Sequence, residues 1–269
     1  MISQPATDAA VVAAAERLLE AERTGTPCAP VRDLIGRDDV LTAYAVQSRV
    51  GATRLESGRT VVGRKIGLTS AAVQQQVGVD QPDFGVLYDD MAYADGAEVP
   101  LGAILQPRAE AEIAFVLSAD LADGDLDDAQ VRDAVDHAVA AIEICGSRIA
   151  GWDISFGDTV ADNASSGGYV LSETRLTLAD FEPRDVTMSM AIDGAEVSTG
   201  AGVACLGDPL LALGWLARKA RELGAPLRAG QVVLSGALGP MKPVEPGSTV
   251  TATIGPLGTV SFTLGKEQS

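Results

Sequence analysis

The sequence predicts an α+β fold in which a helical N-terminal segment, residues 1–59, leads into a β-rich domain, residues 60–269. Three observations support this class. Apolar residues recur at helical spacing over the first 58 residues, short runs with strand-like alternation dominate afterwards, and the two kinds of run do not alternate regularly. The irregular order argues against a doubly wound parallel sheet.

Two helices are expected in the N-terminal segment. The first spans residues 8–23, where Thr7 or Asp8 can cap the start and Gly25 and Pro27 follow the end. The second spans about 38–57, from Asp38 or Asp39 to Gly58. One face of this second helix carries Leu41, Ala45, Ser48, Ala52 and Leu55.

The β-rich part is expected to begin with a strand over residues 60–68 and a short helix over 70–77. Residues 110–118 (EAEIAFVLS) are the clearest strand, and Asp193-Gly194 between two alternating runs predicts a hairpin over 187–199. The remaining expected elements are a helix over 127–141, an extended segment over 141–148, a polar loop over 153–168, a helix over 210–223 and strands over 232–238, 248–254 and 258–264.

Composition excludes several classes of function. The chain has 20 basic and 37 acidic residues, a net charge of −17, which argues against a surface for nucleic acid or an anionic membrane. It contains no run of 18 apolar residues, and its N-terminus lacks the basic region of a signal peptide. The three cysteines, Cys28, Cys145 and Cys205, are widely spaced, so we expect a reduced, cytoplasmic protein.

The residues also exclude common catalytic devices. The single histidine, His137, falls within the predicted 127–141 helix and off its apolar stripe, which is typical of an exposed helix residue. A Ser-His-Asp or Cys-His mechanism would depend on it, and the sequence has no GxSxG motif and no phosphate-binding loop. Carboxylate chemistry remains.

Three glutamates are the candidates for that chemistry. Glu110 and Glu112 are two apart on a predicted strand and therefore point to the same face, where two carboxylates repel unless a cation or proton lies between them. Glu143 lies in an apolar run, AAIEICGS. Mg²⁺ or Mn²⁺ would suit such oxygen ligands. Two alternatives remain open: residues 110–112 as the solvated end of a strand, and an ion pair of Glu143 with Arg148.

Polar residues elsewhere are weaker candidates. Lys65 lies in an otherwise apolar strand beside Arg64, so one of the two must point inward or be shielded; a solvent-exposed cation on an edge strand is an equal alternative. Asp80 and Asp83 fit turn residues as well as functional ones. The small residues of LSGALGP, 234–240, would let the backbone approach an anionic ligand.

Several long blocks resemble the 2-keto-4-pentenoate hydratase family of the fumarylacetoacetate-hydrolase-like superfamily. They are GRKIGLTSAAVQQQVGVDQPDFGVLYDDM, LQPRAEAEIAFVL, AIEICGSRIAGWDISFGDTVADNASSGG and LSGALGPMKPV, in collinear order from about residue 5 to 264. The resemblance implies a mixed β-roll or barrel-like body with a helical N-terminal segment. It implies Mg²⁺ or Mn²⁺ held by Glu110, Glu112 and Glu143.

The resemblance also implies the substrate site and the reaction. Lys65, Asp83 and Ser165 would be catalytic, and the residues expected to bind substrate are Val77, Ser235, Gly236 and Leu238. The reaction would add water to a small 2-hydroxy-dienoate, 2-hydroxypenta-2,4-dienoate, in the meta-cleavage breakdown of aromatic compounds. A homo-oligomer and a downstream aldolase partner are expected. The alternatives are 4-oxalocrotonate decarboxylase and a C–C hydrolase of the acylpyruvase type.

Overall fold

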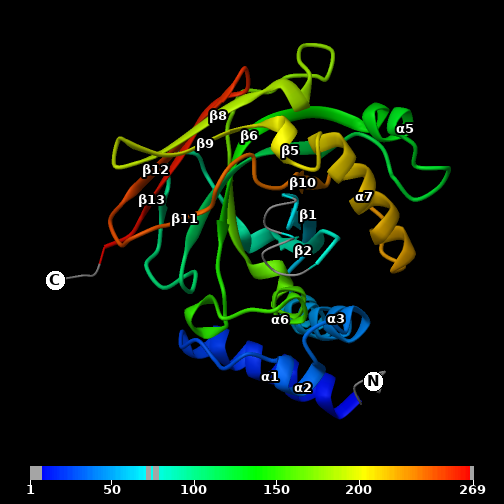
Figure 1. Cartoon of the computed structure of the whole chain (residues 1–269), viewed down its shortest axis with the longest axis vertical. Helices are drawn as coiled ribbons and strands as arrows, with labels where there is room; N and C mark the ends of the chain where they lie inside the picture. The colour runs from blue at the N-terminus through cyan, green and yellow to red at the C-terminus, as the bar shows by residue number, and fades with distance from the viewer. Residues whose placement is uncertain (1–7, 71–73, 75–78, 267–269) are drawn as a thin grey trace.

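The structure is a computed structural model that describes residues 8–70, 74 and 79–266. Helices gather at the N-terminal end and beside two β-sheets (Figure 1). The main helices are α1 (Asp8–Thr24), α2 (Arg32–Ile35), α3 (Val40–Glu56), α5 (Asp128–Asp133), α6 (Phe156–Ala161) and α7 (Pro209–Glu222). The strands are β1 (Val61–Gly67), β2 (Asp83–Tyr88), β3 (Ala92–Tyr93), β4 (Glu98–Val99), β5 (Arg108–Leu117), β6 (Val135–Cys145), β7 (Ser166–Leu171), β8 (Thr187–Ile192), β9 (Ala195–Ala201), β10 (Val232–Leu234), β11 (Lys242–Pro243), β12 (Thr249–Gly255) and β13 (Gly258–Leu264).

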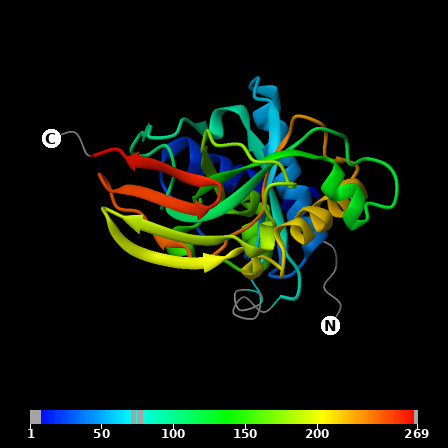
Figure 2. The same cartoon turned by 90° about the horizontal axis from the view of Figure 1, so that it is seen from above.

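The two sheets share one apolar core. The larger sheet has the order β2-β1-β10-β5-β6-β7-β3, with β11 paired to β5, and the smaller has the order β4-β13-β12-β8-β9. One face of β5, with Ile113 and Phe115, packs in the same cluster as Val260 and Phe262 of β13. The strands of the smaller sheet lie along one side of the molecule, away from α7 (Figure 2). This arrangement confirms the predicted α+β class with a β-rich body.

The N-terminal helices pack under the larger sheet. α1 lies against α3, and α3 lies against α6 and also reaches β2, where the rings of Tyr44 and Phe84 stack (Figure 1). The expected helix over 8–23 is confirmed by α1, and its Ala14, Ala15 and Leu18 are buried. The first strand begins at Val61. Because the helices dock on α6, which belongs to the later part of the chain, a division into two domains at residue 59 stays a prediction.

The expected second helix is confirmed by α3, and the face that carries Leu41 and Leu55 is its exposed face. Leu41 and Leu55 are 75% and 50% exposed, while the opposite face, with Tyr44, Val46 and Gln47, is buried. The reason is a tertiary contact that spacing alone does not reveal. The buried Gln47 amide donates from Nε2 to the carbonyl oxygens of Phe84 and Val160, each at 2.9 Å, and so turns this face toward β2 and α6.

The predicted helix over 127–141 is also wrong. Its first turn is present as α5, but the rest of the run forms β6, a long central strand that pairs with β5 on one side and β7 on the other. A continuous apolar run fits either a buried helix or a strand buried on both faces, and here pairing on both edges decides for the strand. His137 therefore lies on a strand opposite Val116, with its Nδ1 2.7 Å from Asp136 Oδ2.

Residues 153–168 are more ordered than the expected polar loop. They contain α6, the short 3₁₀ segment Asn163–Ser165 and the start of β7. Ser155 caps α6: its Oγ accepts from the Asp158 backbone N–H, and its own backbone N–H donates to the Asp158 carboxylate. Most of the helix expected over residues 70–77 lies outside the described residues.

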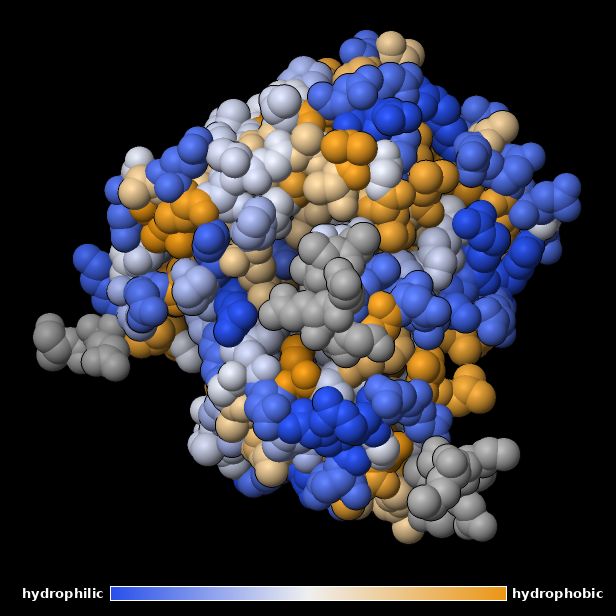
Figure 3. Space-filling model, in the orientation of Figure 1, coloured by the Kyte–Doolittle hydropathy of each residue, from blue (hydrophilic) through white to orange (hydrophobic). Residues whose placement is uncertain are grey.

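The remaining predicted elements agree with the structure. The hairpin at Asp193-Gly194 joins β8 and β9, the expected C-terminal helix is α7, and the last two expected strands are β12 and β13. The strand expected over 232–238 is shorter, because β10 ends at Leu234. Within the described residues, none of the helices combines the length and apolarity needed to cross a membrane. Hydrophilic side chains cover much of the face in Figure 3, with apolar patches between them.

Candidate metal and substrate site

The three candidate glutamates come together on β5 and β6. The antiparallel register places Glu110 directly opposite Glu143, and Glu112 follows two residues along β5 on the same face. Glu112 and Glu143 are both 0% exposed, and Glu110 is half-buried. Like charges directly opposite each other destabilise a sheet, so this pair needs a compensating cation or proton.

Lys65 supplies part of that compensation from β1. Its Nζ lies 3.2 Å from Glu143 Oε1, and the side chain is buried. Arg64 is also buried, so both members of the Arg64-Lys65 pair are shielded and the exposed edge-strand alternative for Lys65 is wrong. The Glu143–Arg148 alternative is wrong as well, because Arg148 pairs with Asp162.

Asp83 enters the same cluster from β2. It lies opposite Gly67 of β1, and a Cβ on Gly67 would come within 2.2 Å of Asp83 Oδ1 and 3.3 Å of Lys65 Nζ. A side chain at position 67 would therefore displace the Asp83 carboxylate, whereas glycine leaves room for both charged groups. Asp83 is 1% exposed, which is rare for a residue that only forms a turn.

A hydroxyl pair from α6 and the following turn completes this side of the site. Thr159 Oγ1 lies 3.4 Å from Asp83 Oδ2 and 3.2 Å from the hydroxyl of Ser165, which was predicted to be catalytic. All three residues are buried. Sequence reasoning missed Thr159, because nothing in the local pattern DTVADN separates it from its neighbours; only the packing of α6 on β2 does so.

The loop after β10 supports Glu112. The backbone N–H of Gly236 donates to Glu112 Oε2 at 2.7 Å. Gly236 has a φ of +106°, and a Cβ there would lie 2.4 Å from Thr69, so only glycine fits. Ser235 and Leu238 are fully buried beside it. The substrate-binding role expected of these three residues stays a prediction, and Val77 lies outside the described residues.

Burial sets the electrostatics of the cluster. Burial raises the pKa of Glu110, Glu112 and Asp83, and repulsion from Glu143 and Glu110 adds to the effect at Glu112. Burial also raises the pKa of Glu143, to about 7, although Lys65 opposes the shift. For Lys65, burial alone would lower the pKa, but the carboxylates around it, Glu143 first, raise it above its ordinary value.

Unpartnered oxygens show that the cluster fits a divalent cation. Both carboxylate oxygens of Glu143, Oε1 of Glu112 and Oδ1 of Asp83 are buried without a hydrogen-bond partner among the described residues. Leaving charged oxygens buried and unsatisfied is costly, and oxygen-seeking ions such as Mg²⁺ or Mn²⁺ would satisfy them. Glu110, Glu143 and Cys145 offer three ligand atoms within 4.8 Å of one another, and Glu112 adjoins this group.

We expect the metal-free protein to lose stability as the pH rises from about 4.5 to above 7. The folded-state pKa of Glu143, about 7, exceeds its ordinary value of 4.5, so the folded state holds the proton more tightly than the unfolded chain does. The free energy of unfolding therefore falls by about 3 kcal/mol as the pH rises from the ordinary pKa of Glu143 to above its folded-state pKa. Urea unfolding of chelator-treated protein at pH 5 and pH 8 measures the loss.

The matched control is Glu143→Gln, which keeps the shape and removes the titration. The difference in unfolding free energy between wild type and variant should change between the two pH values. A constant difference would mean that Glu143 does not titrate in this window.

Comparison with known proteins places these features in a family. Residues 60–264 match the family model described as fumarylacetoacetate (FAA) hydrolase C-terminal. The chain is 52% identical over 257 residues to a "TodF product hydratase" of Pseudomonas putida, with 96% of each chain covered. It is 52% identical over 247 residues to a 2-keto-4-pentenoate hydratase of Paraburkholderia xenovorans, with 92% of each covered.

A solved structure has the same fold. The 4-oxalocrotonate decarboxylase of Pseudomonas putida G7, complexed with magnesium and adipate, superposes with a TM-score of 0.92 at 31% identity, covering 97% of this chain and 100% of that one. This similarity confirms the predicted roll-like body with an N-terminal helical segment. With one family model matched from β1 to β13 and relatives about half identical over nearly the whole length, the chain belongs to the 2-keto-4-pentenoate hydratase family within the fumarylacetoacetate hydrolase superfamily.

Proposed function

We propose that the protein is a divalent-metal-dependent hydro-lyase that converts 2-hydroxypenta-2,4-dienoate into 4-hydroxy-2-oxopentanoate. The observation that carries this proposal is the convergence of three glutamates beside one buried lysine, two of them fully buried with unpartnered oxygens, in a chain whose relatives are named as hydratases. The expected place of the reaction is the meta-cleavage breakdown of aromatic compounds.

Glu110, Glu112 and Glu143 would hold Mg²⁺ or Mn²⁺. When bound, the ion supplies Lewis-acid charge that lowers the cost of forming the enolate of a 2-oxo acid. The protein's own contribution is to keep the three carboxylates in a dry site. The Gly236 N–H fixes one oxygen of Glu112, and Lys65 holds Glu143.

Lys65 is the candidate for stabilising and reprotonating the enolate. Ketonisation of the dienol removes the proton of the C2 hydroxyl and adds one at C5, which gives a 2-oxo-3-enoate. The Lys65 ammonium would stabilise negative charge on the C2 oxygen. Because the neighbouring carboxylates raise its pKa, it is charged at neutral pH and suits this electrostatic role.

Asp83 is the candidate base for the attacking water. The 2-oxo-3-enoate is electrophilic at C4 because the double bond is conjugated to the carbonyl, so water adds there and C3 gains a proton. Burial raises the pKa of Asp83, which makes it a better base than an exposed aspartate. Its Oδ1 has no partner among the described residues, while Thr159 hydrogen-bonds to Oδ2. Ser165 and the 235–239 loop would position the substrate carboxylate.

Three further expectations belong to this proposal. The protein would act in the cytoplasm, as the reduced cysteines suggest. It would assemble as a homo-oligomer. The product is a 4-hydroxy-2-oxo acid, the substrate class of an aldol-cleaving enzyme, so an aldolase would act next and is a candidate partner.

A decarboxylase is the second candidate, because the superposed structure is a decarboxylase. The experiment offers the purified chain with Mg²⁺ two substrates separately, freshly generated 2-hydroxypenta-2,4-dienoate and 2-oxo-3-hexenedioate, and identifies products by NMR. We expect 4-hydroxy-2-oxopentanoate from the first and no CO₂ from the second. CO₂ release without hydration would assign the decarboxylase instead.

Removing a metal ligand provides the internal test. Glu112→Ala is expected to lower Mg²⁺-dependent turnover at least about a hundredfold, because the remaining carboxylates hold the ion poorly. Glu196→Ala, which removes an exposed strand glutamate on β9, is the matched control and should retain activity. Full activity of the wild type after exhaustive chelation would contradict the metal site.

A further inference from the structure

We propose that Cys145 is an additional ligand at the glutamate cluster and that it gives the site a distinct binding mode for thiophilic divalent ions such as Zn²⁺ and Cd²⁺. This inference rests on the metal site described under the proposed function, although not on the hydration reaction. Mg²⁺ and Mn²⁺ would use the carboxylates, whereas a softer ion would also bind the Cys145 sulfur.

The strand register puts the thiol in the site. Cys145 follows Glu143 by two residues on β6, so both side chains point to the same face of the sheet, next to Glu110 on the facing strand. Cys145 Sγ lies 3.7 Å from Glu110 Oε2, and the thiol is the donor of this weak contact. The ligand atoms of Glu110, Glu143 and Cys145 all lie within 4.8 Å of one another.

A second observation points to an ion at this position. Glu143 is fully buried, and neither of its oxygens has a hydrogen-bond partner among the described residues. Among the described residues, the ion pair recorded for this carboxylate is that of its Oε1 with Lys65 Nζ, at 3.2 Å. Cys145 is itself 3% exposed, so its sulfur faces the carboxylates more than solvent. An ion bound between the sulfur and Glu143 would satisfy these oxygens.

Ligand softness predicts which ions would use the sulfur. Carboxylates alone favour hard ions such as Mg²⁺, while thiolates select zinc and softer metals. On binding, the S–H bond breaks, the proton leaves to solvent and a sulfur–metal bond forms, with no oxidation or reduction. The same carboxylates therefore serve both classes of ion, but only the thiophilic class depends on Cys145.

Cadmium titration of the metal-free full-length protein tests the proposal. A sulfur–cadmium bond gives an ultraviolet charge-transfer absorption, and calorimetry gives the affinity. The variants are Cys145→Ser and the double variant Cys28→Ser/Cys205→Ser, which keeps Cys145 as the one remaining cysteine of three. Replacing Cys205 tests whether another cysteine near the site gives the absorption, because its Sγ donates to the carbonyl of Ser235 in the loop that supports Glu112.

We expect the absorption in the wild type and the double variant and its loss in Cys145→Ser. The Cd²⁺ affinity of Cys145→Ser should fall at least about tenfold, while its Mg²⁺ affinity changes little. Absence of the absorption from the double variant, or its persistence in Cys145→Ser, would overturn the proposal. Because the double variant keeps Cys145 and all three glutamates, its absorption tests the proposal even if Cys145→Ser folds poorly.

The outcome is separable from that of the proposed function. If the cadmium–sulfur absorption appears but Mg²⁺ supports no hydration, the hydratase assignment fails and the Cys145 ligand stands. If hydration is observed with Mg²⁺ but cadmium binding gives no sulfur absorption, the hydratase assignment stands and Cys145 is not a ligand.

Discussion

Replacing Lys65 with methionine is expected to lower kcat about a thousandfold while leaving Mg²⁺ affinity within a few-fold of wild type. Methionine has a similar length and no charge, so it removes the ammonium and largely preserves the packing of β1. The expected loss lies in kcat because the ammonium would stabilise charge that develops on the substrate. The metal, in contrast, would be held by the carboxylates.

The physical basis is the position of the ammonium. Lys65 Nζ is 3.2 Å from Glu143 Oε1 in a site where Lys65 is 3% exposed, so water screens its charge poorly. Asp83 and Glu110 also raise its pKa. A preorganised charge in a dry site is worth far more to a developing enolate than the same charge in water.

The neighbouring residue provides the matched control. Arg64 is a buried cation on the same strand, but successive strand residues alternate faces, so its side chain points away from the glutamates. Arg64→Met should therefore retain kcat. The measurements are steady-state kinetics and calorimetric Mg²⁺ binding for both variants. Equal losses of kcat in the two variants, or a Lys65→Met protein that no longer folds by circular dichroism, would assign Lys65 a structural role.

Sequence pattern was sufficient for the parts of the site that lie on one strand. Glu110 and Glu112 share a face because alternation along a strand is a local property, and an acid inside the apolar run around Glu143 signals a buried partner. The sequence pattern could not predict which side chains from different strands lie next to one another. That Glu143 lies opposite Glu110 and beside Lys65, rather than next to Arg148, depends on strand register and sheet order.

The errors in the fold have the same origin. The apolar run over 135–145 is compatible with a helix and a central strand, and only its two neighbours, β5 and β7, decide between them. The inward face of α3 is set by the hydrogen bonds of Gln47 rather than by its leucines. Thr159 and Cys145 were missed as site residues because each becomes informative only when packing brings it next to Asp83 or Glu110.

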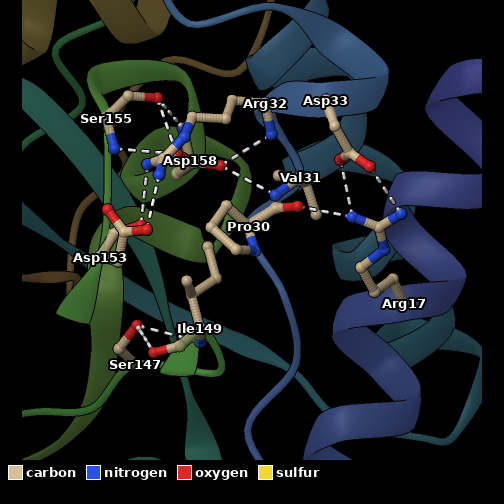
Figure 4. A network of polar contacts seen from close by, with 10 residues as sticks. All are labelled: Arg17, Pro30, Val31, Arg32, Asp33, Ser147, Ile149, Asp153, Ser155 and Asp158. Atoms are coloured by element: carbon tan, nitrogen blue, oxygen red, sulfur yellow. Dashed lines mark hydrogen bonds and ion pairs between the residues drawn. The ribbon is translucent and has the colours of Figure 1, made fainter. Parts of the chain in front are cut away.

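Asp158 is the residue on α6 whose loss we expect to be most costly to stability. Its carboxylate is 0% exposed and links the helical segment to α6 (Figure 4). Oδ1 accepts from the backbone N–H groups of Val31 and Arg32, each at 2.8 Å. Oδ2 accepts from the Arg32 guanidinium at 2.9 Å and from the backbone N–H and hydroxyl of Ser155.

Asp158→Ala is expected to lower the free energy of unfolding by about 3–5 kcal/mol, because it breaks a buried ion pair and leaves several buried donors unsatisfied. Urea unfolding followed by circular dichroism measures the loss. Asp153→Asn is the control: Asp153 bonds the same guanidinium at 2.7 Å but is 69% exposed, so its loss should lower the free energy of unfolding far less.

Asp158→Ala should also lower kcat, since Asp158 directly precedes Thr159 on α6. If α6 shifts, Thr159 loses its hydrogen bonds to Asp83 and Ser165. The value of kcat should then fall more in Asp158→Ala than in Asp153→Asn, when both are measured under conditions in which the proteins are folded. Equal stability of the two variants would mean that the five hydrogen bonds to Asp158 do not anchor the helical segment. An unchanged kcat with lowered stability would mean that α6 keeps Thr159 in place without them.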